Sequence, residues 1–550
     1  MKTPPNLRAP DQVMRLSRLG SMHMSRLSVS RSVVRRARRL GWRMWRERFA
    51  LDAQGHGVAI YAVDLGGRIV SLVAFSQYLP DELRMDRVIA TAWDTSYVLY
   101  DGVPDAAEIE RLRANVPRQE AGRFSRKELI LARANKSVRS FGDVVDALSR
   151  GRQPDAQPLR EAGYLLRTSA VYGNGKFGIA DREDVVSIPG LAGAFTAELL
   201  TVWLIRSFSV DLAEHCAAAR AAAAGGRAAR LAAELRRDIG IGNSTGLGMA
   251  PFIVRHPMLL HRWIMARENA LANALRSGTL DEARRGSLQG LMTTWLRKIG
   301  FWTTQNPEQT EAIARLDQDL RRLNEIVAAA TDPQAVLAAA EAELGVEAQE
   351  LTISLLIDSA TDDDGDRLAD MADDGPGLHP AAASGGCARA LDALLRRYDW
   401  AMRYDFTSAD ADARFWYTSQ EKIEPRIGWR GDDEGEELEQ PLGVARDIQR
   451  LAAALRSRPA SQELDAFLAA HPECRHSLRR LHMADAHPYA EIRDNLLDAS
   501  IRPRDMMRAK LSFLGADFFD PASEMSVKVR FFQGAPFPDD PSAGLGDGMW

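Results

Sequence analysis

Residues 57–75, GVAIYAVDLGGRIVSLVAF, contain two runs rich in β-branched and aromatic residues on either side of a Gly-Gly pair. Two such runs around a glycine pair are typical of a β-hairpin, because glycine adopts the positive φ values that tight turns need. A third run, RVIATAWDTSYVLYDG at residues 87–102, follows along the chain. The sequence therefore predicts a three-stranded antiparallel meander between Val58 and Gly102.

Outside the meander the apolar spacing is helical almost everywhere. Spacings of three and four residues predict a docking helix in GWRMWRERFAL, with Trp42, Trp45 and Phe49 on its apolar face. A helix is also expected in SRKELILARANKSVRSFGDVVDALSRG, and the residues expected to form its buried stripe are Leu129, Ala132, Val138, Val145 and Leu148. Extended segments are expected at residues 163–181 and, more briefly, at SVKVRFFQ near the end. The expected fold class is mainly α (α+β), a helical body with a small N-terminal antiparallel β-meander and a C-terminal helical domain.

Length and composition set the domain organisation. A chain of 550 residues exceeds the usual size of one hydrophobic core, which is about 250 to 300 residues. An acidic, Gly- and Pro-rich stretch without apolar periodicity predicts a linker or long loop at residues 359–388. The predicted parts are a basic arm or helix at 1–50, a meander with the main helical domain at 51–358, that linker, a C-terminal helical domain at 389–535, and a flexible tail at 536–550.

The first 48 residues carry thirteen Lys or Arg against only Asp11 and Glu47. Such a start is typical of a transit peptide, a nucleic-acid arm or a membrane-surface helix. The interpretation we favour is an arm that lies on an acidic part of the same chain. The formal net charge of −4 argues against a nucleic-acid-binding protein as a whole.

The glycine-rich stretch GIGNSTGLGMAPF at residues 240–252 contains a GxSxG pattern. A nucleophile elbow needs a strand before the serine, but the preceding ARLAAELRRDIGI is helical, so we reject a serine hydrolase. Glycines with Asn243, Ser244 and Thr245 instead predict a loop whose backbone N–H groups bind an anion. The alternative, weighed equally, is a plain crossover between two helices.

A second glycine pattern, GNGKFG at residues 173–178, matches GxGxxG, but no convincing helix follows it, so we reject a dinucleotide fold. The strand and turn around it carry polar groups that could hold a carboxylate or phosphate by charge-assisted hydrogen bonds. The substrate-binding candidates in this segment are Arg167, Tyr172, Asn174 and Lys176. A solvated hairpin edge is the alternative.

A third polar region lies at ARANKSVRSF, where Arg133, Lys136 and Arg139 recur every third residue and would share one side of a helix. We take Lys136 and Arg139 as substrate-binding candidates, with a solvated basic stripe as the alternative. Glu120, in the preceding PRQEAGRF, is a candidate acid or base.

A fourth region, ARFWYTSQEKIEPRIGWR at residues 413–430, is rich in charge. Pro425 disfavours helix at the residue before it, so a helix should end there and present its charged groups at a loop. Glu421 and Lys422 are the candidate acid/base pair, and Arg426 is a candidate for substrate binding. An ordinary charged surface turn is the alternative.

Several classes of site are not expected. The histidines lack metal-ligand spacing and the three cysteines lack CxxC spacing, so we predict no metal site and no cofactor. The cysteine usage and the lack of a long apolar run predict a cytoplasmic protein without a membrane partner. Homo-oligomer formation is left open.

These features predict a metal-independent enzyme that acts by acid/base chemistry on a small anionic substrate, as in an elimination, isomerisation or decarboxylation. The alternative is a non-catalytic helical protein that binds a ligand or another protein. Convergence of Lys176, Asn243 and Glu421 in one closed pocket would favour the enzyme.

Overall fold

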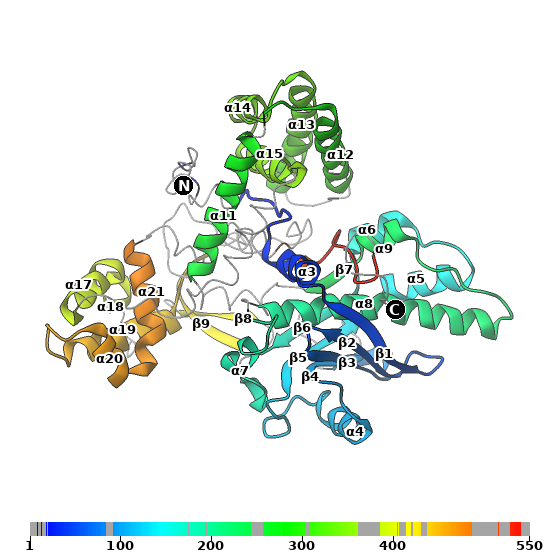
Figure 1. The fold of residues 1–550 in the computed structure, drawn as a ribbon, viewed down its shortest axis with the longest axis horizontal. Coiled ribbons are helices and arrows are strands. Elements are labelled where there is room, and N and C mark those ends of the chain that lie inside the picture. The colour runs from blue at the N-terminus through cyan, green and yellow to red at the C-terminus, as the bar shows by residue number, and fades with distance from the viewer. Residues whose placement is uncertain are drawn as a thin grey trace.

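The computed structural model describes most of the chain (Figure 1). The described residues are Arg8, Val13, Arg18, 20–83, 92–173, 175–192, 195–243, 257–276, 278–300, 302, 307–360, 386–403, 405, 414–419, 422–430, 437–486, 515 and 529–540. Within these ranges some residues, including all of 414–419, 422–430 and 437–441, are described by their backbone alone. Helices predominate among the described residues, as the sequence predicts.

The first sheet is larger than the predicted meander, and it is mixed. Its strand order is β1-β2-β3-β4-β5-β6-β7-β11, and neighbours are antiparallel except for the parallel pair β6 and β7. The strands are β1 (Arg43–Leu51), β2 (Gly57–Asp64), β3 (Ile69–Ser76), β4 (Thr95–Asp101), β5 (Glu128–Lys136), β6 (Tyr164–Tyr172), β7 (Gly240–Asn243) and β11 (Val529–Phe531). The predicted strands are thus present, but they form only one part of this sheet.

The β2–β3 hairpin forms where the glycine pair predicts it. Gly66 and Gly67 have φ values of 93° and 104°, and the Asp64 carboxylate accepts both of their N–H groups, at 3.0 and 2.6 Å. Positive φ at both central residues matches the right-handed twist of the flanking strands.

Two helices expected from the sequence are strands instead. GWRMWRERFAL forms β1, and the first part of SRKELILARANKS forms β5, before helix α5 (Ser140–Ser149) begins. In β5 the consecutive residues Leu129, Ile130 and Leu131 are all buried, because both faces of the sheet are covered. Burial on both faces removes the alternation that marks a strand, so the apolar spacing resembled that of a helix.

Each face of the sheet has its own core. The 28-residue helix α8 (Thr196–Ala223) packs on one face together with α3 (Val29–Arg39) and α5. Helix α4 (Ala106–Asn115) contributes Ile109 and Leu112 to the core on the opposite face. Shorter helices of this region are α6 (Ala156–Ala162), α7 (Arg182–Val186) and α9 (Ala233–Asp238), with 3-10 turns η1 (Asp81–Leu83) and η2 (Lys176–Gly178).

Figure 1 shows two further helical groups. Each of them has a hydrophobic core of its own. The first comprises α11 (Pro257–Arg276), α12 (Glu282–Ile299), α13 (Pro307–Ala329), α14 (Pro333–Glu343) and α15 (Val346–Ser359). The second comprises α17 (Cys387–Arg397), α18 (Asp399–Arg403), α19 (Leu442–Arg456), α20 (Leu464–Ala470), η5 (Pro472–Cys474) and α21 (Arg475–Ala486). The predicted domain boundaries stay predictions, and residues 361–385 of the predicted linker lie outside the described residues.

A second, antiparallel sheet has the order β10-β9-β8 and interrupts the C-terminal helices. Its strands are β8 (Arg414–Ser419), β9 (Lys422–Arg430) and β10 (Glu437–Pro441). The expected helix ending before Pro425 is therefore wrong. Pro425 lies opposite Trp416 within the β8–β9 pair.

The chain returns to the first sheet at its C-terminal segment. The predicted short strand at SVKVRFFQ is present as β11, which pairs with β7. Arg206 of α8, fully buried, donates hydrogen bonds to the carbonyl groups of Ile239 and Pro536, at 2.6 and 3.3 Å. Among the described residues no helix has the length and apolar character to cross a membrane. Cytoplasmic location and any oligomer stay predictions.

Candidate functional site

The predicted binding residues of β5 and β6 do not form one site. The register places Asn135 opposite Arg167 and Leu131 opposite Tyr172. Lys136 and Tyr172 therefore lie at opposite ends of the strand pair, roughly 16 Å apart along it at the usual rise per residue. The predicted site divides into two regions.

The first region is an aromatic cluster around Tyr172. Arg133 donates a hydrogen bond to the Tyr172 hydroxyl at 3.0 Å, and its guanidinium carbon lies 3.5 Å from the centre of the Trp93 ring. The Lys176 ammonium lies 4.4 Å from the centre of the Tyr172 ring. Burial lowers the pKa of Arg133 to about 10. Two cations thus lie on aromatic faces, which stabilises them where water is partly excluded.

The predicted basic stripe is wrong, because Arg133 and Lys136 lie on a strand. Arg133 contacts Tyr172 on the α4 face of the sheet, whereas Lys136 lies near Phe141 on the α8 face. Arg139 is exposed in the N-cap position of α5, and its side chain makes no capping hydrogen bond.

The glycines at the start of the predicted anion loop have another role. Gly240 and Gly242 belong to β7, and neither has a positive φ. A Cβ at Gly240 would lie 2.6 Å from the Phe531 carbonyl oxygen, and one at Gly242 would lie 2.6 Å from the Tyr164 ring. These glycines allow close packing, so the predicted anion-binding conformation is wrong for them. Asn243 is described by its backbone, and Ser244 and Thr245 lie outside the described residues.

The predicted acid/base residues are placed only in part. Glu120 is exposed, and its carboxylate accepts a hydrogen bond from the Arg123 Nε at 2.6 Å, which makes an ordinary surface ion pair. Lys422 and Arg426 lie in β9, where only the backbone is described. Glu421 and Asn174 lie outside the described residues, so the expected convergence of Lys176, Asn243 and Glu421 stays untested.

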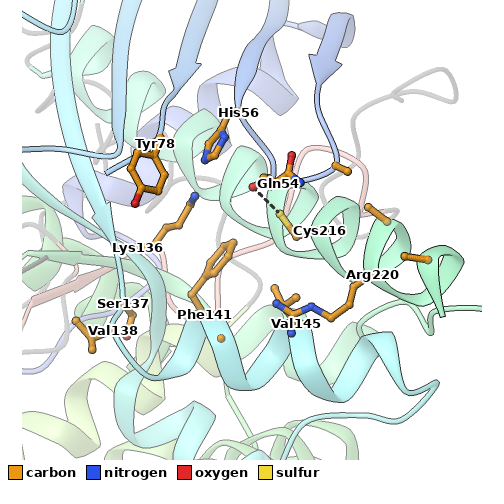
Figure 2. A pocket seen from close by; sticks show the side chains of 14 residues that line it. Gln54, His56, Tyr78, Lys136, Ser137, Val138, Phe141, Val145, Cys216 and Arg220 are labelled. Carbon is orange, nitrogen blue, oxygen red and sulfur yellow. Dashed lines mark hydrogen bonds between the residues drawn. The ribbon is translucent and has the colours of Figure 1, made fainter. Parts of the chain in front are cut away.

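The second region, around Lys136, contains a cavity of about 780 Å³, which we call the hairpin pocket (Figure 2). It lies between the tip of the β1–β2 hairpin, the residues after β5, and helices α5 and α8. Its lining residues are Ala53, Gln54, His56, Tyr78, Lys136, Ser137, Val138, Phe141, Gly142, Val145, Cys216, Ala219, Arg220 and Ala223. A volume of 300 to 1,000 Å³, roughly, is typical of small-molecule sites.

One wall of the hairpin pocket forms because the β1–β2 turn docks on α8. A Cβ at Gly55 would lie 2.7 Å from the Cys216 sulfur, so only glycine allows this approach. The His215 Nε2 lies 2.8 Å from the Asp52 carbonyl oxygen and holds the turn from the helix side. Burial raises the pKa of the Cys216 thiol, which therefore stays neutral and serves packing.

Lys136 is positioned by its backbone. Its N–H group donates to the fully buried Asp94 carboxylate at 3.1 Å, and the next N–H group, of Ser137, donates to the Leu165 carbonyl at 2.8 Å. The ammonium lies 5.5 Å from the centre of the Phe141 ring. Figure 2 shows it directed toward His56 and Tyr78. Among the described residues no carboxylate forms an ion pair with this ammonium.

The other charged groups of the hairpin pocket have partners. Arg220 pairs with the Asp146 carboxylate. The His56 Nδ1 lies 3.5 Å from an Asp52 carboxylate oxygen. Sequence reasoning found Lys136 but missed His56, Tyr78 and Arg220, because these come from segments far apart that no local pattern connects.

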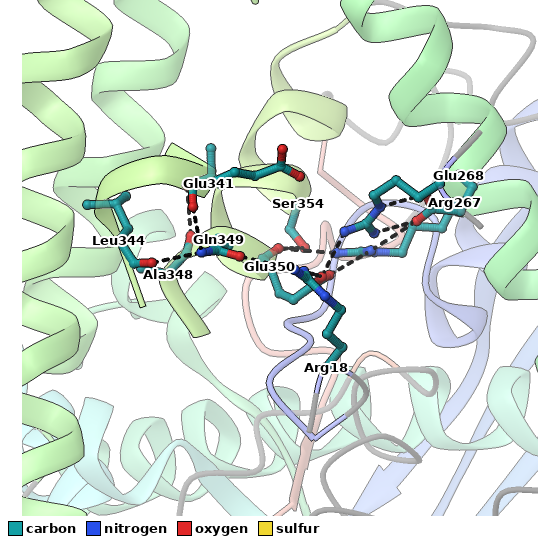
Figure 3. A network of polar contacts seen from close by, with 11 residues as sticks. Arg18, Arg267, Glu268, Glu341, Leu344, Ala348, Gln349, Glu350 and Ser354 are labelled. Carbon is teal, nitrogen blue, oxygen red and sulfur yellow. Dashed lines mark hydrogen bonds and ion pairs between the residues drawn. The ribbon is translucent and has the colours of Figure 1, made fainter. Parts of the chain in front are cut away.

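A separate polar network joins the basic N-terminal arm to the helical body (Figure 3). Arg8 and Arg18 donate to the fully buried Glu350 at 2.9 and 2.8 Å, and Arg267 lies 3.0 Å from it. Arg8 also contacts Glu268, at 2.6 Å. Burial alone would raise the pKa of Glu350, but these guanidinium groups lower it to about 2. These contacts agree with an arm that lies on acidic residues of its own chain.

We interpret this network as structural, because both of its carboxylates, Glu268 and Glu350, are paired with guanidinium groups of the same chain. No group of three or more His, Cys, Asp or Glu in the described part of the chain is arranged to hold a metal ion.

No protein-family model matches this sequence, and neither a curated protein nor a solved structure gives a significant match to it.

Proposed function

We propose that this protein binds a small anionic molecule in the hairpin pocket, with Lys136 as the group that holds the anion. One observation carries the proposal: the Lys136 ammonium faces a cavity of about 780 Å³ and has no carboxylate partner among the described residues. A charged group that is partly removed from water is stabilised by an opposite charge. A bound anion supplies that charge.

The experiment is calorimetric titration of 3-phenylpropionate into the wild type and Lys136→Met. Methionine keeps most of the side-chain volume and removes the charge, so we expect binding about tenfold weaker or more. Lys127→Met is the matched control, because Lys127 precedes the same strand and its ammonium lies 6.0 Å from the centre of the Tyr100 ring, away from the pocket. Equal affinity of all three proteins would contradict the proposal.

A second candidate function is acid/base catalysis on the bound anion, the reaction class that the sequence predicts. The observation that favours it is His56, whose Nδ1 lies 3.5 Å from an Asp52 carboxylate oxygen at the same pocket. A carboxylate beside one imidazole nitrogen orients the ring and leaves the other nitrogen for proton transfer. In this proposal His56 takes the acid/base role considered for Glu120, Glu421 and Lys422.

Catalysis is tested separately from binding. In D₂O, NMR would follow replacement of the hydrogens next to the carboxylate of 3-phenylpropionate by deuterium. Exchange by the wild type that is lost in His56→Gln supports proton abstraction, provided that His56→Gln still binds the anion. Binding without exchange supports the non-catalytic function.

A further inference from the structure

We infer that the ligand of the hairpin pocket is an amphipathic monoanion, a single carboxylate attached to an apolar body, and not a small hydrophilic anion. This inference rests on the proposed function and adds the chemical class of the ligand. It is argued from the distribution of apolar and charged groups along the pocket.

The hairpin pocket has a polar end and an apolar wall. Figure 2 shows Lys136, His56 and Tyr78 at one end, with the Phe141 ring between them and Val145. The wall continues over small side chains of α8, namely Cys216, Ala219 and Ala223. An anion at Lys136 would therefore lie close to the Phe141 ring, since the ammonium lies 5.5 Å from the ring centre.

The apolar groups near the rim are unusually exposed for their type. Tyr78 is 70% exposed and Val138 is 53% exposed, and both line the same cavity. Covering apolar surface of this kind stabilises a complex, because the surface is removed from water. Both residues line the pocket on the side of Lys136, and a ligand with apolar groups would cover more of this surface than a bare phosphate would.

The charge of the site fits one negative charge. Arg220 is paired with Asp146, and His56 faces Asp52. Lys136 is the cation of this pocket for which the described residues provide no carboxylate. A dianion would bring a second negative charge into the pocket, and none of the described lining residues offers an unpaired cation for it. Removing that second charge from water would therefore be unfavourable.

The experiment compares four probes by calorimetric titration into the full chain. 3-Phenylpropionate has both the charge and the apolar body, acetate has the charge alone, 3-phenylpropanamide has the body alone, and phenyl phosphate carries a second charge. We expect 3-phenylpropionate to bind about tenfold more tightly, or more, than each of the others.

A steric variant locates the binding. Gly142 lies in α5 and lines the hairpin pocket, and a Cβ built there meets no atom within 4 Å. The side chain of Gly142→Leu would occupy the cavity, so we expect about tenfold weaker binding or more. The matched control is Gly290→Leu, because Gly290 is an exposed glycine of α12 with equally open surroundings.

The outcomes separate the inference from the proposed function. If acetate or phenyl phosphate binds as tightly as 3-phenylpropionate and Lys136→Met abolishes that binding, the inference is wrong while the proposed function stands. If the amide binds as tightly as the carboxylate, or no probe binds, both fail. If Gly142→Leu binds as the Gly290→Leu control does, the ligand lies elsewhere and both fail.

Discussion

Gly55 lies directly against Cys216, so that a Cβ at position 55 would come within 2.7 Å of the sulfur and 2.8 Å of the Leu212 Cδ1. The β1–β2 turn touches α8 at this point, which forms one wall of the hairpin pocket. The approach depends on glycine for a second reason as well, because the φ of Gly55 is +81°.

Gly55→Ala should destabilise the protein by about 1–3 kcal/mol more than the matched control Gly66→Ala. Gly66 also has a positive φ, +93°, but a Cβ there meets no atom within 4 Å. The two variants therefore share the backbone strain and differ in the clash with α8. Urea unfolding measures both free energies of unfolding, and equal losses would show that the turn does not pack tightly on the helix.

Gly242→Ala should also destabilise the protein, by about 1–3 kcal/mol, because the new Cβ would lie 2.6 Å from the Tyr164 ring. In a Tyr164→Ala background the same change should cost less than about 1 kcal/mol. A double-mutant cycle by urea unfolding measures the difference. A cost that is the same in both backgrounds would mean that Gly242 is required for a reason other than this packing.

Glu350→Gln should cost about 3–5 kcal/mol, because it leaves three buried or half-buried guanidinium groups without their shared carboxylate. The control is Glu343→Gln, which removes an exposed ion pair with Arg322 and should cost less than about 1 kcal/mol. Similar losses for the two variants would show that the network adds no more than a surface pair.

The contribution of Glu350 should also depend on pH. Its folded-state pKa of about 2 lies below the ordinary value of 4.5, so the unfolded state binds the proton more readily. The stabilisation, of about 3 kcal/mol by linkage, is complete above pH 4.5 and is lost as the pH falls toward 2. The difference in unfolding free energy between wild type and Glu350→Gln should shrink between pH 6 and pH 3. A constant difference would contradict the lowered pKa.

Asp211 should have the opposite pH dependence. Burial raises its pKa to about 6, although the Tyr61 hydroxyl, at 2.8 Å, and Arg46 favour the charged form. The folded state then binds the proton more readily, so stability falls as the pH rises from about 4 to 6 and stays lower above it. The unfolding free energy of Asp211→Asn minus that of the wild type should therefore be larger at pH 7.5 than at pH 4.5. We expect the increase to be about 1–2 kcal/mol after allowance for solvent screening. Urea unfolding at the two pH values tests this, and an equal effect at both would refute it.

Local sequence patterns predicted some elements well and others poorly. The β2–β3 hairpin follows from its glycine pair and its apolar runs, and β11 follows from SVKVRFFQ. Strand β5 was missed, because Leu129 and Leu131 face different cores and the usual alternation is absent. The prediction for Gly240 and Gly242 was wrong for a different reason. A glycine can be required for a positive φ or for a close contact, and the sequence does not distinguish the two.

The sequence by itself determined the predominance of helices, the β2–β3 hairpin and the uneven charge of the N-terminal segment. It also identified Lys136 as a candidate binding residue. These are properties of residues and their near neighbours, which fix turn conformation, periodicity and charge. Only the tertiary structure decided that Lys136 would share a pocket with His56 and Tyr78. It alone also decided that Arg8 would meet Glu350, 342 residues away. Such contacts depend on how strands pair and on which helix covers each face of the sheet, and side chains brought together in this way leave no spacing in the sequence.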